Sequence, residues 1–456
     1  MAGIGFEIRK FLKQDSFLGL FKAYGYAGLI SSGPWVLSIL GVLVIGIVSA
    51  SLVGRSEEVV QFLVSVTYLM AASLIASSWL QLMFTRFVAD RSFEKKDNIV
   101  LPNLFGALLI MSLMATAIGA ALLPLFAETS YGYRLLMLAN FVVLCNLWIV
   151  VIMVSGMRVH KQVLGVFALG YGVTVIAALA LARFGLEGLM TGFLIGHVVL
   201  SFFLLGMVVR EYEAANLVSF SHLRPGQVFY GLAFTGLFYN LATWADKLIF
   251  WYNPDTSEAL IGPLRASIIY DPPIFLAYLS IIPGMAVFLL RMETDFVEAY
   301  DRFYGAIREG ETFECIERNK LRMVESIRSG LTEILKVQGV VALLLIVSAD
   351  SILDWVGIST TYAPLFAVDV AGVGVQVFML GIFNVFFYLD KRRIVLVLSG
   401  LFLLSNAGFS YISQLLGPEF YGYGFACAAA LTCLVGLVIL SKKLERLEYE
   451  TFMLQV

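Results

Sequence analysis

The chain has 456 residues, of which 60% are hydrophobic and 14% are charged, and its formal net charge at pH 7 is −2. Soluble domains are about 45–50% apolar and about 25% charged, so this composition excludes an ordinary soluble protein and indicates a polytopic membrane protein. The nearly balanced charge gives no support for a nucleic-acid-binding protein.

Residues 1–27 form a charged segment that precedes the long apolar runs. The segment lacks the short apolar core and the small-residue cleavage site that are typical of a signal peptide. Ile4, Ile8 and Phe11 can share one helical face, while Arg9 can reach toward lipid phosphates. We therefore expect an amphipathic helix that lies in the membrane interface.

Long apolar runs follow up to residue 441, and a helix needs about 20 such residues to cross the hydrocarbon core. The pattern predicts an all-α protein with twelve transmembrane helices. Two of them contain candidates for a helix break or gate: Gly33 and Pro34 in the first, and Pro283 and Gly284 in the eighth. The expected ranges are 28–53, 59–84, 100–126, 134–157, 163–182, 188–209, 228–252, 273–290, 337–357, 364–389, 394–416 and 420–441.

The distribution of Lys and Arg predicts how these helices are oriented, because cytoplasmic loops carry an excess of positive charge. With the N-terminus inside, the expected cytoplasmic segments carry 26 Lys and Arg residues. The extracytoplasmic loops then carry three, which are Arg55, Arg183 and Arg265. We therefore expect both termini to be cytoplasmic and the number of spans to be even.

Twelve spans suggest two lobes of six helices each. We expect the first lobe at residues 28–209 and the second at 228–441, joined by a polar cytoplasmic linker at 210–227. Residues 442–456 would form a cytoplasmic tail. Because six is even, both lobes would enter the membrane with the same polarity, as parallel repeats do.

The longest predicted loop, residues 291–336, precedes the ninth span. Residues 292–336 carry ten acidic and seven basic side chains, and apolar residues recur at helical spacing from Leu321 to Ile334. Two interpretations are open. The loop is either a solvated helical hairpin that joins two spans or a docking surface for a cytoplasmic partner.

The sequence lacks the motifs of several enzyme classes. No lysine follows a glycine, which excludes a Walker A phosphate loop, and no two aspartates lie two residues apart, as in metal-dependent glycosyltransferases. The three histidines are scattered, and the four cysteines show no metal-ligand or disulfide pattern. We expect no enzymatic activity, no metal and no cofactor.

Polar side chains inside the predicted spans are candidates for a substrate path. They cost free energy in hydrocarbon unless they pair or face water, although any one of them can instead be an interhelical packing contact. The polar candidates are Asn140, Asn240, Asp246, Asp369 and Gln376. The aromatic candidates are Tyr24, Trp35 and Trp244.

Asp246 and Lys247 are adjacent charges near the outer end of the seventh predicted span. Neighbouring helix positions point in directions about 100° apart, so we expect the two side chains to be poor partners. Lys247 can extend outward to the interface beside Trp251 and Tyr252. Asp246 is shorter, and we expect it to line the outer half of a transport cavity or to face a basic group on another helix.

The first 41 residues, MAGIGFEIRKFLKQDSFLGLFKAYGYAGLISSGPWVLSILG, resemble the PelG family of inner-membrane transporters of the Pel exopolysaccharide system. The predicted spans, the chain length and the long loop before the ninth span are similar to that family across nearly the whole sequence. The resemblance implies a flippase-like transporter with two six-helix lobes in the bacterial inner membrane. It also implies export of an N-acetylgalactosamine-rich polysaccharide, with a PelF-like glycosyltransferase and PelD-like and PelE-like membrane proteins as partners.

Two other functions fit the residues. An ion-coupled antiporter of small molecules would need a buried carboxylate that exchanges a proton or Na⁺, for which Asp246 and Asp369 are the candidates. A non-transporting scaffold of a synthase complex would use the loop at 291–336 and the C-terminal tail as docking sites.

Overall fold

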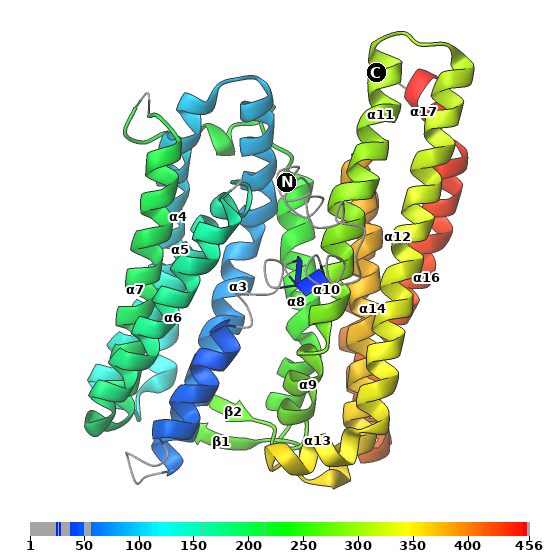
Figure 1. The fold of residues 1–456 in the computed structure, drawn as a ribbon. Coiled ribbons are helices and arrows are strands. Elements are labelled where there is room, and N and C mark those ends of the chain that lie inside the picture. Colours follow the sequence, from blue (N-terminus) through cyan, green and yellow to red (C-terminus); the bar gives the residue numbers. More distant parts are fainter. Residues whose placement is uncertain are drawn as a thin grey trace. The chain divides into compact units, whose positions relative to one another are not determined.

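The computed structural model describes residues 24–25, 27–28, 37–49, 56–157, 159–214 and 216–453. These residues are mainly helical, and two short strands form the only sheet among them (Figure 1). The predicted interfacial helix at 1–27 and the break predicted at Gly33 and Pro34 lie largely or wholly outside the described residues.

The chain divides into two compact units. The amino unit comprises Gly33–Trp244 and Trp251–Ser267. The carboxy unit comprises Met1–Ser32, Ala245–Phe250 and Ile268–Val456. The polar linker predicted at 210–227 therefore belongs to the amino unit, and the boundary between the units falls within one helix.

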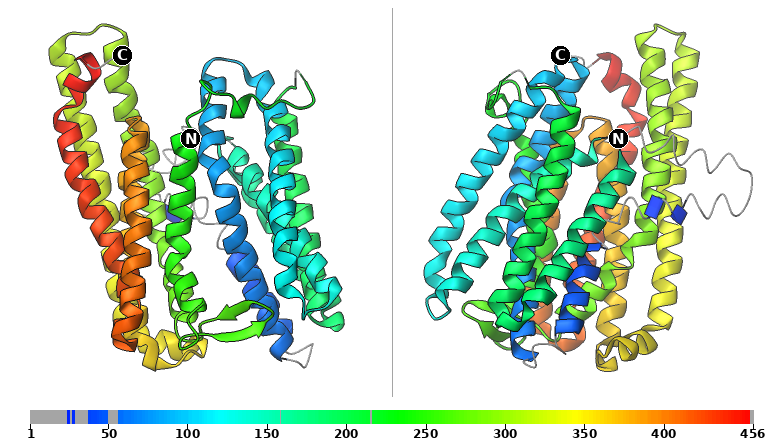
Figure 2. Two further views of the ribbon diagram at one scale, coloured as in Figure 1. Left: turned by 180° about the vertical axis from the view of Figure 1, so that it is seen from behind. Right: turned by 60° about the vertical axis from the view of Figure 1, so that its left-hand side comes forward.

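The amino unit is a bundle of long helices with a β-hairpin (Figures 1 and 2). Its helices α6 and α7 pack closely because glycines face the partner backbone: a Cβ at Gly192 would lie 2.3 Å from the main chain of Ala178. The elements are helix Leu37–Ser49, α3 (Ser56–Phe93), α4 (Val100–Leu122), α5 (Tyr131–Ser155), α6 (His160–Leu181), α7 (Gly185–Glu211), most of α8 (Tyr230–Trp251), β1 (Glu258–Ile261) and β2 (Leu264–Ala266).

The connector between α7 and α8 is anchored to α4 of its own unit. The main-chain N–H of Ser219 donates to the carbonyl of Pro102 at 2.9 Å, and that of His222 donates to the Asn103 side chain at 3.0 Å. The His222 ring is buried and lies edge-on to Phe84, with 5.5 Å between ring centroids. This polar segment is therefore packed against the bundle at several points.

The carboxy unit contains the second set of long helices. All of them begin after Ser267, and six residues of α8 also belong to this unit. They are α9 (Asp271–Tyr278), α10 (Ile281–Leu290), the π-helix η5 (Arg291–Phe296), α11 (Val297–Arg308), α12 (Phe313–Val347), α13 (Ala349–Val356), α14 (Ala363–Tyr388), α15 (Arg392–Leu416), α16 (Tyr423–Glu445) and α17 (Leu447–Met453).

The loop predicted at 291–336 is a helical hairpin made by α11 and α12, which projects beyond the end of α14 (Figure 1). Thr312 caps α12 by accepting a hydrogen bond from the N–H of Cys315. The helix then continues without interruption into the ninth predicted span. The apolar residues of the predicted stripe are divided, since Ile334 is fully buried whereas Leu321 is 61% exposed.

The eighth predicted span is broken, as the sequence indicates, but the break precedes Pro283. Helix α9 ends at Tyr278 and α10 begins at Ile281. A proline ring clashes with the carbonyl four residues earlier, which here belongs to Leu279. The side-chain amide of Gln338 on α12 donates to the carbonyl of Ser280 at 3.0 Å, so a neighbouring helix provides a hydrogen bond for one main-chain carbonyl at the break.

Within the described residues, nine helical segments are long and apolar enough to cross a membrane. Helix Leu37–Ser49 is apolar but shorter, and α8 is not among the nine. The sequence of α8 explains this, because Asn240, Asp246 and Lys247 lower its mean hydropathy. The number of twelve spans and the cytoplasmic termini remain predictions.

Candidate functional site

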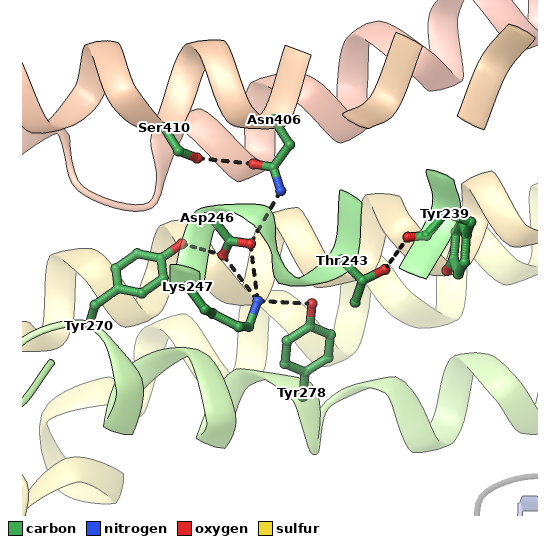
Figure 3. A network of polar contacts seen from close by, with 8 residues as sticks. All are labelled: Tyr239, Thr243, Asp246, Lys247, Tyr270, Tyr278, Asn406 and Ser410. Carbon is green, nitrogen blue, oxygen red and sulfur yellow. Dashed lines mark hydrogen bonds and ion pairs between the residues drawn. The ribbon is translucent and has the colours of Figure 1, made fainter. Parts of the chain in front are cut away.

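Near its C-terminal end, α8 places Asp246 and Lys247 in the interior of the carboxy unit (Figure 3). Asp246 is 0% exposed and Lys247 is 1% exposed. Two charged side chains in such an environment require partners, because an unpaired buried charge is costly.

The two residues are each other's partners. The Lys247 ammonium lies 3.0 Å from Oδ2 and 3.2 Å from Oδ1 of Asp246. The expectation that they would be poor partners is therefore wrong, and so is the expectation that Lys247 extends outward. The different directions of the two Cα–Cβ bonds do not prevent this ion pair, because the flexible lysine side chain bends back toward its neighbour along the helix.

Neutral donors complete the coordination of the Asp246 carboxylate. The Tyr270 hydroxyl donates to Oδ2 at 2.7 Å, and the Asn406 amide on α15 donates to Oδ1 at 3.2 Å. Ser410, one turn further along α15, donates to Asn406 Oδ1 at 3.0 Å and so orients that amide. The carboxylate is therefore held from α8, from the segment before α9 and from α15 (Figure 3).

Aromatic rings surround the Lys247 ammonium. Its Nζ lies 5.0 Å from the centroid of Tyr278 and 5.5 Å from that of Phe425, and it donates to the Tyr278 hydroxyl at 3.5 Å. Such rings attract a cation more strongly where water is excluded. The Tyr270 ring is itself fixed by Phe250, which stacks on it at 3.9 Å between centroids.

Asp369 on α14 is a second buried carboxylate in this unit, within electrostatic range of Asp246 and Lys247. Neither of its oxygens has a hydrogen-bond partner among the described residues. Gly422 lies against it: a Cβ at this glycine would be 2.8 Å from Asp369 Oδ1, and the glycine has φ +85°. A side chain at position 422 would therefore collide with the carboxylate and strain the backbone.

The other polar candidates lie elsewhere in the structure. Asn140 is buried in the amino unit, where its amide donates to main-chain carbonyls of α5 and α7. Asn240 bonds to the carbonyl of Gly236 on its own helix. Gln376 lies on α14, two turns after Asp369, and is also buried. Of the polar candidates, the structure thus brings Asp246 and Asp369 into one neighbourhood.

The aromatic candidates are separated as well. Tyr24 bonds to Glu333 on α12, which is not part of the network around the buried pair. Trp244 belongs to the amino unit and lies 6.0 Å from the Trp251 ring. Trp35, like Gly33 and Pro34, lies outside the described residues. Gly284 is in α10, where a Cβ would be 2.4 Å from the Gln338 side chain.

Sequence reasoning missed the residues that complete the network. Asn406 is recognisable as a polar residue within a span, but nothing in its spacing connects it with Asp246, 160 positions away. Tyr270 and Tyr278 resemble ordinary interfacial tyrosines in the sequence. Gly422 is one of 40 glycines, and only its neighbours show why it is needed.

A family model of exopolysaccharide exporters, PelG (EPS-E), matches residues 1–452. The chain belongs to the PelG family. No curated protein matches the chain.

Solved transporters of the MOP superfamily have a similar fold. A MOP superfamily transporter from Pyrococcus furiosus is 15% identical, with a TM-score of 0.63 over 94% of this chain and 96% of that one. An outward-facing multidrug resistance MATE family transporter is 14% identical, with a TM-score of 0.62 over 94% and 96%. An inward-facing one is also 14% identical, with a TM-score of 0.60 over 92% and 95%. At such low identity the likeness establishes the fold alone.

Together, the family and the apolar helices indicate a multi-pass membrane protein that is a transporter. This agrees with the resemblance seen in the N-terminal sequence.

Proposed function

We propose that this PelG family member moves an N-acetylgalactosamine-rich exopolysaccharide across the bacterial inner membrane, through a polar path between two six-helix lobes. The observation that carries the proposal is the family match over residues 1–452. The proposal includes twelve spans, cytoplasmic termini and a polymer supplied by a PelF-like glycosyltransferase that assembles with PelD-like and PelE-like membrane proteins.

The buried network supports a role for the carboxy unit in contacting this polymer. Tyr270, Asn406 and Ser410 carry the hydroxyl and amide groups that suit sugar hydroxyls and N-acetyl groups. In this structure those groups are turned toward Asp246, directly or through one another. We expect the same groups to exchange these hydrogen bonds for hydrogen bonds to the polymer when it passes. In a closed state, the ion pair would provide their hydrogen-bond partner.

The direct test is reconstitution of the purified protein with its glycosyltransferase in sealed vesicles, with the sugar nucleotide supplied on the enzyme side. Polymer that becomes protected inside the vesicles, and depends on the transporter, would support the proposal. Equal protected polymer in vesicles that lack the transporter would refute it. Leaving out the PelD-like and PelE-like proteins one at a time shows which of them transport needs.

The role of Asp246 is tested by Asp246→Asn in the same vesicles. We expect export to fall at least tenfold at equal protein abundance, because an amide cannot hold Lys247 as a carboxylate does. Ser441→Ala, an exposed position on α16, serves as the control. Export at the wild-type level in Asp246→Asn would exclude this residue from the path.

A second candidate function is an ion-coupled antiporter of small molecules, which the unpartnered oxygens of Asp369 among the described residues favour. A buried carboxylate without a partner is much less costly when it is protonated or binds a cation, so it could exchange one during transport. Export that collapses with the proton or Na⁺ gradient when it is measured without synthesis, and that is lost in Asp369→Asn, would support ion coupling. Gradient-independent export would reject it.

A further inference from the structure

Two side-chain oxygens at the break between α9 and α10 have no partner. The Ser280 hydroxyl and Gln338 Oε1 are buried and make no hydrogen bond within the described residues. Ser280 is 4% exposed and Gln338 is 2% exposed, so neither side chain is open to solvent. A buried polar atom without a partner costs free energy, and two such atoms at one place therefore point to a ligand between or beside them.

The orientation of the Gln338 amide follows from its contacts. Its Nε2 donates to the main-chain carbonyl of Ser280 at 3.0 Å. Because a carbonyl can only accept, the nitrogen must be the atom at Ser280 and Oε1 must be the atom left over. That oxygen lies against Gly284, where an added Cβ would be 2.4 Å from it. The glycine thus makes room for an unpaired carbonyl oxygen one turn from the Ser280 hydroxyl.

The main chain at the break supplies a further oxygen. Proline has no N–H, so Pro283 cannot donate to the carbonyl of Leu279 four residues earlier. That carbonyl receives a long contact of 3.5 Å from the N–H of Ile282. Acceptors therefore outnumber donors here, near the middle of the eighth predicted span. In transporters, the unwound carbonyls of broken membrane helices coordinate Na⁺.

We propose that the break between α9 and α10 binds a monovalent cation, Na⁺, through Gln338 Oε1, the Ser280 hydroxyl and the carbonyl of Leu279. Ca²⁺ and Mg²⁺ fit this site less well, because their sites are generally built with carboxylates and the groups at the break are neutral. The site is distinct from Asp369, which the antiporter alternative would use. The inference concerns binding, so it stands whether or not the ion drives export.

The charge of the surrounding unit favours a cation over a neutral water molecule. Asp246 and Lys247 cancel each other, whereas the buried Asp369 adds one more negative charge when it is ionised. Asp369 lies five residues before Gly374 on α14, which is about 7.5 Å along the helix axis. Gly374 faces Gln338, since an added Cβ would lie 3.0 Å from the Gln338 Cγ. In low-dielectric surroundings a charge at this range attracts a cation.

The experiment measures Na⁺ binding by the purified full chain in detergent. Binding of radioactive Na⁺ is followed by equilibrium dialysis, and thermal unfolding is compared in NaCl and in choline chloride at equal ionic strength. Choline is too large for such a site, so it controls for screening by salt. A ligand that binds the folded state alone stabilises it, so the Tm of the wild type should be higher in Na⁺ than in choline.

Two variants remove or displace the Gln338 oxygen. Gln338→Met keeps the size of the side chain without its oxygen, and Gly284→Ala places a methyl group against that oxygen. Each should weaken Na⁺ binding about tenfold, as the loss of a ligand does at metal sites. Gly339→Ala is the control, because a Cβ at this neighbouring position of α12 would meet no atom within 4 Å. It should leave Na⁺ binding unchanged.

Ser280→Ala separates a ligand from a hydroxyl that is merely buried. In choline this variant should be about as stable as the wild type, because the lost hydroxyl makes no hydrogen bond there. In Na⁺ it should be less stable than the wild type, with a clearly weaker affinity for the ion. Ser399→Ala on α15 is the matched control, since the Ser399 hydroxyl is also buried without a partner within the described part of the chain. Its effect should be the same in both salts, and this pair decides the question even if Gln338→Met fails to fold.

Two results would overturn the proposal. The first is a wild-type protein that binds no radioactive Na⁺ and unfolds at the same temperature in both salts, which would leave an internal water molecule only. The second is Na⁺ binding that the variants at the break and their controls affect equally, which would place the ion elsewhere. Neither measurement needs export, so such a failure leaves the transport proposal standing, and a failure of export in vesicles leaves the binding result intact.

Discussion

Asn406 and Asp246 are joined by a hydrogen bond of 3.2 Å between the Asn406 amide and Asp246 Oδ1, which ties α15 to the end of α8. This contact connects residues 160 positions apart in a fully buried place. It belongs to a network in which one charge pair and several neutral donors depend on one another. This network and three other sites in the structure each depend on particular residues.

The Asp246–Lys247 pair should show strong coupling in a double-mutant cycle. Asp246→Asn and Lys247→Met should each destabilise the protein by about 3–5 kcal/mol, because each leaves a buried charge without its partner. The double variant should lose less than the sum of the two, since it removes both charges. Unfolding in detergent is the measurement, with the exposed Lys442→Met as the control. Strictly additive losses would contradict the ion pair.

Gly422 should tolerate no side chain. Gly422→Ala should destabilise the protein by about 2–4 kcal/mol, because the new Cβ would lie 2.7 Å from Leu365 and 2.8 Å from Asp369 in addition to the backbone strain. Gly357→Ala is the matched control, since Gly357 is also in the left-handed region, with φ +80°, but a Cβ added there would meet no atom within 4 Å. It should cost only the strain, about 1–2 kcal/mol. Equal losses in the two variants would show that contact with Asp369 is unimportant.

His222 should make the amino unit sensitive to acid. Burial lowers the pKa of the His222 imidazole to about 4, from an ordinary value of 6.5. A group whose pKa is lower in the folded state contributes stability above its unfolded pKa and loses it as the pH falls. Stability should therefore decrease between about pH 6.5 and pH 4, by roughly 1–3 kcal/mol.

The measurement is unfolding of the wild type and of His222→Gln across that pH range. The variant should be less stable than the wild type at pH 7. Because glutamine does not titrate, the stability of the variant should also change less on acidification. If the dependence of stability on pH is the same in the wild type and in His222→Gln, the acid sensitivity comes from other groups. Asn103→Ala should destabilise at neutral pH, since Asn103 Oδ1 accepts from the main-chain N–H of His222.

The C-terminal helix α17 should be held in place by ion pairs. Glu450 lies between Lys391 and Lys443, and Glu448 pairs with Lys320 of α12 at 3.0 Å. Burial acts to raise the pKa of the Glu450 carboxyl, but the hydrogen bonds from the two lysines lower it below the ordinary 4.5. Its contribution should therefore be present above about pH 4.5 and fade as the pH falls.

Glu450→Gln should increase hydrogen exchange in residues 447–453 by several-fold at pH 7, with little change in α16. Glu445→Gln is the control, because Glu445 is exposed and its described contact is only with Ser441. Exchange that rises equally in both variants would indicate a general effect of lost charge. Unchanged exchange in Glu450→Gln would mean that α17 is held by apolar contacts such as the buried Leu447.

Much of this architecture can be predicted from composition and hydropathy. Apolar runs long enough to cross a bilayer must be helical there, because every main-chain polar group must be paired within its own segment. The break before α10 also follows from local chemistry, since Pro283 disrupts the helix whatever packs around it. The N-terminal sequence indicated the PelG family, which the family match confirmed.

The buried site was predicted only in part. That Asp246 needed a partner followed from the cost of a charge in hydrocarbon, but the partner itself did not. The partner proved to be the adjacent Lys247, assisted by donors from the segment before α9 and from α15. Hydropathy measures each side chain alone, so it gives the cost of burial without the geometry that offsets it.

The sequence by itself therefore determined the membrane class, the positions of most helices, the proline break and the family. Only the tertiary structure decided that Lys247 turns inward, that Asn406 reaches Asp246 and that Gly422 makes room for Asp369. The physical reason is the range of the forces. Helix formation in lipid depends on neighbours along the chain, whereas the pairing of a buried charge depends on atoms brought together from several helices.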